Sequence, residues 1–210
     1  MVFFLMDSKQ LLLQSLKQKK FSKEILQAFS EVERKDFIPK DLRERAYEDI
    51  ALPIGKNQTI SQPYTISVML SLAELKKGEK ILEIGSGCGY VLALLSRIVG
   101  PEGRVFGVEI IKELFELSKE NLREYNNVEV YNKNGFFGLK EKAGFDKFLI
   151  SAAIDKIPKL LVEQLKNNGI IVSTIGDRYG QSIISFKKTK NELKIKKQIP
   201  GFIFVPFVDD

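Results

Sequence analysis

The chain has 210 residues, of which 44% are hydrophobic and 29% charged, proportions typical of one folded globular domain and not of a disordered or fibrous protein. It contains no histidine, which excludes Ser-His-Asp triads, histidine metal ligands and imidazole acid/base catalysis. A single cysteine, Cys88, excludes an intrachain disulfide, and no apolar run is long enough to span a bilayer. We therefore expect a cytoplasmic protein without a metal centre or a membrane partner.

The net charge of +6 comes largely from one lysine-rich run, Lys187 to Lys197. Its alternation predicts a hairpin with one lysine-covered face, and lysines on an exposed strand protect a sheet edge from pairing with another chain. This interpretation is favoured over a nucleic-acid site. Nothing in the sequence sets the oligomeric state, and a monomer is the simplest expectation.

In chain order, the first predicted elements are helices between about Ser8 and Arg45, where apolar residues recur at helical spacing. Two turn-rich stretches follow, Ala51 to Gly55 and Asn57 to Pro63, which we do not expect to form core structure. A helical pattern resumes from Tyr64 to Leu75. This part, residues 1–77, is predicted to be an N-terminal helical and substrate-cleft segment.

Beyond it, residues 78–210 alternate short apolar runs with amphipathic stretches, which predicts an α/β core with a mainly parallel sheet and a C-terminal hairpin, within one domain covering 1–210. Strands are predicted at Lys80–Ile84, Arg104–Glu109, Val128–Tyr131, Lys147–Ser151, Ile170–Thr174 and Ile183–Lys187. Helices are predicted at Tyr90–Ile98, Ile111–Tyr125 and Ile157–Leu165, the last of them stopped by Asn167-Asn168-Gly169.

A buried strand runs into a glycine-rich turn at Ile81 to Tyr90, with glycine at positions 85, 87 and 89. Glycines there let the backbone turn tightly and let a ligand approach without a Cβ in the way. The G-x-G-x-G spacing, with Glu83 two residues upstream, is typical of S-adenosylmethionine sites, whereas a dinucleotide site would prefer glycine in place of Tyr90. We therefore predict that Glu83, Gly85, Gly87 and Gly89 contribute to a cofactor site.

The next strand ends in Glu109, about twenty residues beyond the loop, where a carboxylate can accept both hydroxyls of a ribose. After the third strand, Asn134 and Gly135 stand where such folds place a polar group against an adenine edge. The Asn134 amide can donate and accept, so it can pair with adenine, but an Asn-Gly pair is also a common turn. Both interpretations stay open.

At the end of the fourth strand stand Ser151, Ala152 and Ala153. Methyltransferases that act on adenine amines carry a proline-rich aromatic motif there, and this chain does not. The two alanines leave room for a substrate backbone to approach, although packing against a helix explains them equally well.

Several segments together resemble the protein-L-isoaspartate O-methyltransferase family from about Phe37 to Phe207. They are Arg45 to Asp49, Leu52 to Gly55, Gln58 to Tyr64, the glycine-rich turn, Ala152-Ala153 with Ile157-Pro158, and Phe204 to Phe207. The Gln-Thr-Ile-Ser-Gln-Pro stretch is the most specific of these, because general methyltransferases of this fold do not carry it.

The resemblance implies a Rossmann-like sheet of seven strands with helices on both faces, S-adenosylmethionine as methyl donor, and methylation of the free α-carboxylate of L-isoaspartyl residues in damaged proteins. The ester then cyclises to a succinimide, which reopens partly to normal aspartate. By the same resemblance Ser61 takes the catalytic serine position, Thr59 and Ile60 line the substrate cleft, and Phe204 to Phe207 close over the site.

One departure concerns the third strand, where the family usually has Gly-Asp-Gly and this chain has Lys133-Asn134-Gly135. Two alternatives remain open at this point. The first is a methyltransferase acting on RNA or a small molecule, which the lysine run would favour. The second is a homologue that binds the cofactor without catalysis, for which Asn134 is the only hint.

Overall fold

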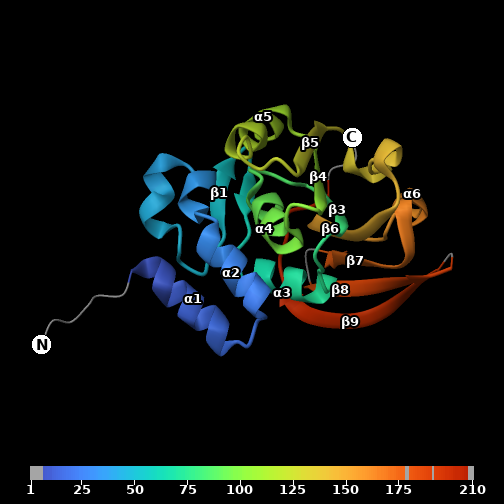
Figure 1. Cartoon of the computed structure of the whole chain (residues 1–210), viewed down its shortest axis with the longest axis horizontal. Helices are drawn as coiled ribbons and strands as arrows, with labels where there is room; N and C mark the ends of the chain where they lie inside the picture. The colour runs from blue at the N-terminus through green and yellow to red at the C-terminus, as the bar shows by residue number, and fades with distance from the viewer. Residues whose placement is uncertain (1–6, 178–179, 191, 208–210) are drawn as a thin grey trace, which may run out of the picture.

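A computed structural model describes residues 7–177, 180–190 and 192–207. Its centre is one seven-stranded sheet in the order β5-β4-β3-β6-β7-β8-β9, with helices on both faces, as Figure 1 shows. The five strands from β5 to β7 are parallel, and β8 and β9 are antiparallel additions. The predicted α/β fold class is confirmed.

The sheet strands are β3 (Lys80–Ile84), β4 (Arg104–Glu109), β5 (Val128–Asn132), β6 (Phe145–Ile154), β7 (Leu165–Asp177), β8 (Gly180–Thr189) and β9 (Glu192–Phe202). All six predicted strands are present. Strands β3, β4 and β6 are almost wholly buried because helices cover both faces of the sheet. Their sequences are therefore nearly continuous apolar runs.

The helices are α1 (Ser8–Gln18), α2 (Lys23–Glu31), α3 (Pro63–Ala73), α4 (Tyr90–Val99), α5 (Lys112–Asn121) and α6 (Lys159–Gln164), with 3-10 turns η1 (Arg34–Phe37), η2 (Lys40–Arg45), η3 (Gly135–Phe137) and η4 (Lys140–Lys142). The N-terminal helices join α3, α4 and α5 in the larger core. A second core lies under α6 on the opposite face of the sheet. No helix among the described residues is long and apolar enough to cross a membrane.

The stretches predicted as turns on either side of Lys56 form a two-stranded hairpin of β1 (Leu52–Gly55) and β2 (Gln58–Ile60), so that prediction is wrong. Lys56 and Asn57 both have positive φ, at 53° and 58°, which suits a tight hairpin turn. Leu52 and Ile60, which face each other across the two strands, are both buried. Core contacts thus outweigh the turn-rich composition.

The predicted helix stop at Asn167-Asn168-Gly169 is also wrong, because α6 ends at Gln164 and these residues belong to β7. Leu165 already pairs with Phe145 of β6, so strand pairing replaces the helix. Asn168, with φ of 66°, lies in the irregularity at which the pairing register between β6 and β7 shifts.

The predicted lysine-rich hairpin is confirmed as the antiparallel pair β8–β9. Lys194, Lys196 and Lys197 lie exposed on β9, the edge strand of the sheet, as edge protection requires. Lys188 departs from this pattern, because it is 8% exposed and donates to the carbonyls of Val162 and Leu165, at 2.7 and 2.6 Å.

Candidate active site

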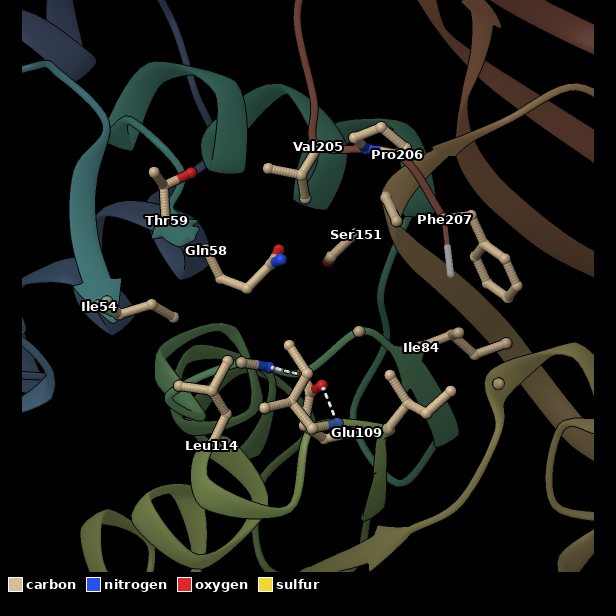
Figure 2. A pocket seen from close by; sticks show the side chains of 16 residues that line it. Ile54, Gln58, Thr59, Ile84, Glu109, Leu114, Ser151, Val205, Pro206 and Phe207 are labelled. Atoms are coloured by element: carbon tan, nitrogen blue, oxygen red, sulfur yellow. Dashed lines mark hydrogen bonds between the residues drawn. The ribbon is translucent and has the colours of Figure 1, made fainter. Parts of the chain in front are cut away.

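A cleft lies at the carboxyl ends of β3, β4 and β6, close to the point where the strand order reverses. Ligand sites of open parallel sheets form at this position. Figure 2 shows side chains from segments far apart in the sequence pointing into one space. The lining residues are Ile54, Gln58, Thr59, Ile84, Gly85, Gly87, Glu109, Ile110, Ile111, Leu114, Gly135, Ser151, Ala152, Val205, Pro206 and Phe207.

The glycine-rich turn after β3 takes the left-handed backbone that its composition favours, with φ of 77° at Gly85, 53° at Gly87 and 87° at Gly89. Gly85 and Gly87 line the cleft. Gly89 does not line it. It is the N-cap of α4 and packs against the end of α5, where a Cβ would lie 2.7 Å from Leu122 Cδ1. Two of the three glycines therefore line the cleft, and the third allows two helices to pack.

Glu109 lies at the carboxyl end of β4, beside the turn, and is 5% exposed. Its Oε2 accepts a hydrogen bond of 2.7 Å from the Gly87 amide, and its Oε1 accepts one of 2.9 Å from the Ile111 amide. Both bonds appear as dashed lines in Figure 2. The carboxylate is held rigidly in the cleft wall, and each oxygen retains a lone pair for a further donor.

Glu83 is 1% exposed and is not one of the cleft-lining residues. Its Oε1 accepts a hydrogen bond of 2.7 Å from the hydroxyl of Ser151, which does line the cleft. Burial, together with the nearby Glu109 charge and against the Ser151 hydrogen bond, raises the pKa of Glu83 to about 8. Glu83 is therefore protonated at neutral pH. It does not line the cleft itself and is linked to it through the hydrogen bond from Ser151.

The segment after β5 brings Gly135 to the cleft, where a Cβ would lie 2.3 Å from Ile84 Cγ2. Asn134 is not a lining residue. Its side chain caps η3 by accepting a hydrogen bond of 2.8 Å from the Phe136 amide. The turn interpretation of the Asn-Gly pair is thus present in the structure, and contact with adenine remains a prediction.

Thr59 and Gln58, on β2, line the cleft together, and Figure 2 shows the Gln58 side chain pointing toward its middle. Ile60, which the resemblance placed in the cleft, is 4% exposed and packs in the core. Ser61 follows directly and is half-buried, outside the lining set. Its carbonyl accepts a hydrogen bond of 3.1 Å from Arg34.

The C-terminal segment runs along one edge of the cleft, and Phe204, which the resemblance placed over the site, is buried in the core. Residues Val205 to Phe207 line the cleft and run alongside the end of β6. The Ala153 amide donates to the Val205 carbonyl at 2.9 Å, and the Phe207 amide donates to the Ala153 carbonyl at 2.8 Å. Of the two alanines, Ala152 lines the cleft and Ala153 pairs with the C-terminal segment.

Ser151 and Gln58 are cleft residues that the sequence did not single out. Ser151 could have been predicted from its place at the end of a central strand. Gln58 could have been predicted because it belongs to the same family-specific stretch as Thr59. No group of three or more cysteine, aspartate and glutamate side chains in the described ranges is placed to hold a metal ion.

The arrangement fits a nucleoside cofactor. A fixed carboxylate, Glu109, can accept ribose hydroxyls, while Ile110, Ile111 and Leu114 beside it offer an apolar surface for a flat base. The missing Cβ atoms of Gly85 and Gly87 let a ligand approach the backbone. Across the cleft the β1–β2 hairpin directs the polar Gln58 side chain into the same space.

Comparisons with known proteins agree with this geometry. The sequence model of the family described as Protein-L-isoaspartate(D-aspartate) O-methyltransferase (PCMT) matches residues 7–210. The protein-L-isoaspartate O-methyltransferase of Ignicoccus hospitalis is 41% identical over 191 residues, covering 90% of each chain. That of Methanothrix thermoacetophila is 39% identical over 202 residues, covering 95% of this chain and 94% of the relative.

Among solved structures, a protein-L-isoaspartate O-methyltransferase superposes with a TM-score of 0.85 at 29% identity, over 94% of this chain and 65% of that one. A putative protein-L-isoaspartate O-methyltransferase from Plasmodium falciparum, in complex with S-adenosyl-L-homocysteine, shares the fold with a TM-score of 0.85 at 24% identity, over 98% of this chain and all of that one. The chain belongs to the protein-L-isoaspartate(D-aspartate) O-methyltransferase family.

Proposed function

We propose that this chain transfers a methyl group from S-adenosylmethionine to the free α-carboxylate of L-isoaspartyl residues in damaged proteins, the first step of their repair. As a member of its family it is an S-adenosylmethionine-dependent protein carboxyl O-methyltransferase. The observation that carries the proposal is the shape of the cleft. It sets Glu109 and the glycine-rich turn opposite the hairpin that bears the most family-specific stretch.

The cofactor half of the cleft consists of Gly85, Gly87, Glu109 and Gly135, with apolar residues from the start of α5. S-adenosylmethionine supplies an electrophilic methyl group on a sulfonium. The Glu109 carboxylate would accept the ribose hydroxyls, and the two turn glycines would lie against the cofactor. Glu83 would act indirectly, because it accepts the hydrogen bond that orients the Ser151 hydroxyl in the cleft wall.

The substrate half is formed by the β1–β2 hairpin, and Ser61 follows the hairpin directly in the chain, outside the residues that line the cleft. A carboxyl group with pKa near 4 is ionised at neutral pH, so it attacks a methyl group without a general base, which suits a chain without histidine. Positioning then supplies the rate. Holding reactants at near-attack distance lowers a barrier by roughly 7 to 11 kcal/mol in the most favourable intramolecular cases.

In this scheme the hydroxyls of Ser61 and Thr59 orient the substrate carboxylate through neutral hydrogen bonds. A cation in their place would bind the anion tightly in the ground state and would help the chemical step little. Val205, Pro206 and Phe207 line the cleft beside the end of β6 and would exclude water from the bound cofactor and substrate.

The deciding experiment is methyl transfer from labelled S-adenosylmethionine to a synthetic peptide containing L-isoaspartate, with the same peptide containing normal aspartate as control. We expect label in the isoaspartyl peptide alone, as a base-labile ester. Label in neither peptide, with cofactor still bound, would refute the assigned substrate and direct attention to RNA or small-molecule acceptors.

A further inference from the structure

Arg34, the first residue of η1, is the largest fully buried side chain among the described residues, with an exposed fraction of 0%. A guanidinium carries its charge at every physiological pH, and burying that charge is costly unless its donors are satisfied. All three of its hydrogen-bond acceptors are backbone carbonyl oxygens. Nε has no hydrogen-bond partner among the described residues. The buried charge of Arg34 is therefore stabilised mainly by the backbone segments whose carbonyls it contacts.

The three acceptors come from separate parts of the chain. Nη1 donates to the Ala46 carbonyl at 2.6 Å, just after η2. Nη2 donates to the carbonyls of Ile50, at 3.0 Å, and Ser61, at 3.1 Å. Ile50 lies two residues before β1, and Ser61 directly follows β2. A single nitrogen therefore joins the two ends of the hairpin at its base.

This hairpin forms one wall of the cleft, and Figure 2 shows Ile54 and Gln58 pointing inward from it, with Thr59 at the edge of the space. An isolated two-stranded hairpin is marginally stable in water, so its position depends on what anchors it. At its tip, Lys56 pairs with Glu113 of α5, but their side chains are 49% and 61% exposed, and exposed ion pairs are weak. The buried anchor is at the base.

We propose that Arg34 is a positioning residue for methyl transfer, which fixes both ends of the β1–β2 hairpin and so holds Thr59 and Ser61 in register with the cofactor half of the cleft. Arg34 acts through backbone carbonyls and does not touch the reacting atoms. The proposal rests on the proposed function only in its effect on activity. Its effect on the hairpin is independent of the substrate.

A matched control exists in Lys188, which is also a buried cation whose donors meet backbone carbonyls. It bonds Val162 and Leu165, at the far side of the sheet and away from the cleft. Arg34→Met and Lys188→Met each remove a buried charge and the side-chain donors of backbone carbonyls. Both should lose stability, and only the first should disturb the hairpin.

The test compares Arg34→Met, Arg34→Lys and Lys188→Met in the full chain, well below their melting temperatures. Hydrogen–deuterium exchange should rise within residues 52–60 in Arg34→Met and stay at the wild-type level there in Lys188→Met. For the isoaspartyl peptide, kcat/KM should fall roughly 10- to 100-fold in Arg34→Met, the scale of a misplaced reacting group, while S-adenosylhomocysteine affinity is kept.

Arg34→Lys keeps the charge and can donate to part of the carbonyl set, so it should recover some of the lost activity, and it carries the test if Arg34→Met does not fold. Unchanged exchange in the hairpin, or an activity loss no larger than in Lys188→Met, would overturn the proposal. A wild-type protein that does not methylate the isoaspartyl peptide would refute the proposed function, and the exchange result would still decide whether Arg34 positions the hairpin.

Discussion

The Glu109 carboxylate accepts a hydrogen bond of 2.7 Å from the Gly87 amide, so the last residue of β4 is bound directly to the glycine-rich turn after β3. The two elements that sequence motifs assign to one cofactor are thus fixed to each other before any ligand arrives. Such preorganisation lowers the free-energy cost of ordering these residues when a ligand binds.

Replacing Glu109 with alanine should weaken S-adenosylhomocysteine binding by roughly 1 to 3 kcal/mol, because ribose hydroxyls lose their acceptor and the Gly87 amide loses its partner. Isothermal titration calorimetry measures the change. Glu113→Ala, on the exposed surface of α5, serves as the control and should bind as the wild type does. Equal affinities for wild type and Glu109→Ala would remove Glu109 from the cofactor site.

Ser61→Ala should lower turnover on an isoaspartyl peptide and leave cofactor affinity nearly unchanged. The Arg34 hydrogen bond to this position uses the Ser61 carbonyl, so the substitution keeps the anchor and removes only the hydroxyl. Steady-state kinetics and calorimetry together separate the two effects. A variant that loses cofactor binding would contradict the role proposed for Ser61.

Glu83→Gln should change how stability depends on pH. Burial raises the pKa of Glu83 to about 8 from an ordinary 4.5, so between these values the folded state keeps a proton that the unfolded state has lost. Glu83 therefore lowers the free energy of unfolding progressively as pH rises from about 4.5 to about 8. Above about pH 8 it causes no further decrease. Glutamine resembles the neutral form and removes the dependence.

Denaturant unfolding of both proteins from pH 5 to pH 9 checks this sign. The free energy of unfolding of the wild type, relative to Glu83→Gln, should fall by up to about 1.4 kcal/mol per pH unit and level off above about pH 8. A difference that rises with pH would show that Glu83 is ionised in the folded state.

Gly135→Ala should destabilise the protein by roughly 1 to 3 kcal/mol, the usual cost of overpacking, because the new Cβ would lie 2.3 Å from Ile84 Cγ2 in the cleft wall. It should also weaken cofactor binding. Gly180→Ala is the matched control, since nothing lies within 4 Å of a Cβ there. Thermal unfolding of the pair, with and without S-adenosylhomocysteine, compares them, and equal behaviour would contradict the packing argument.

The sequence by itself determined the cofactor half of this protein. Its signals are local: a buried strand, a glycine-rich turn and a helix in succession, then an acidic residue at the end of the next strand. Short-range geometry fixes such units, so β3, β4 and the positions of Gly85, Gly87 and Glu109 follow from the residues alone.

Tertiary structure decided the rest, because contacts between residues distant in the sequence overrode local preference. The turn-rich residues form the β1–β2 hairpin because Leu52 and Ile60 pack in the core. Leu165 and Ile170 pair with β6 on either side of Asn167 to Gly169, so these residues belong to β7 and do not end a helix. Glu83, predicted to contribute to the cofactor site, does not line the cleft, and its carboxyl group accepts a hydrogen bond from Ser151, 68 residues away. Arg34, 27 residues from Ser61, gave no local signal, since nothing about an arginine in a helical segment reveals the carbonyls it will meet when the chain has folded.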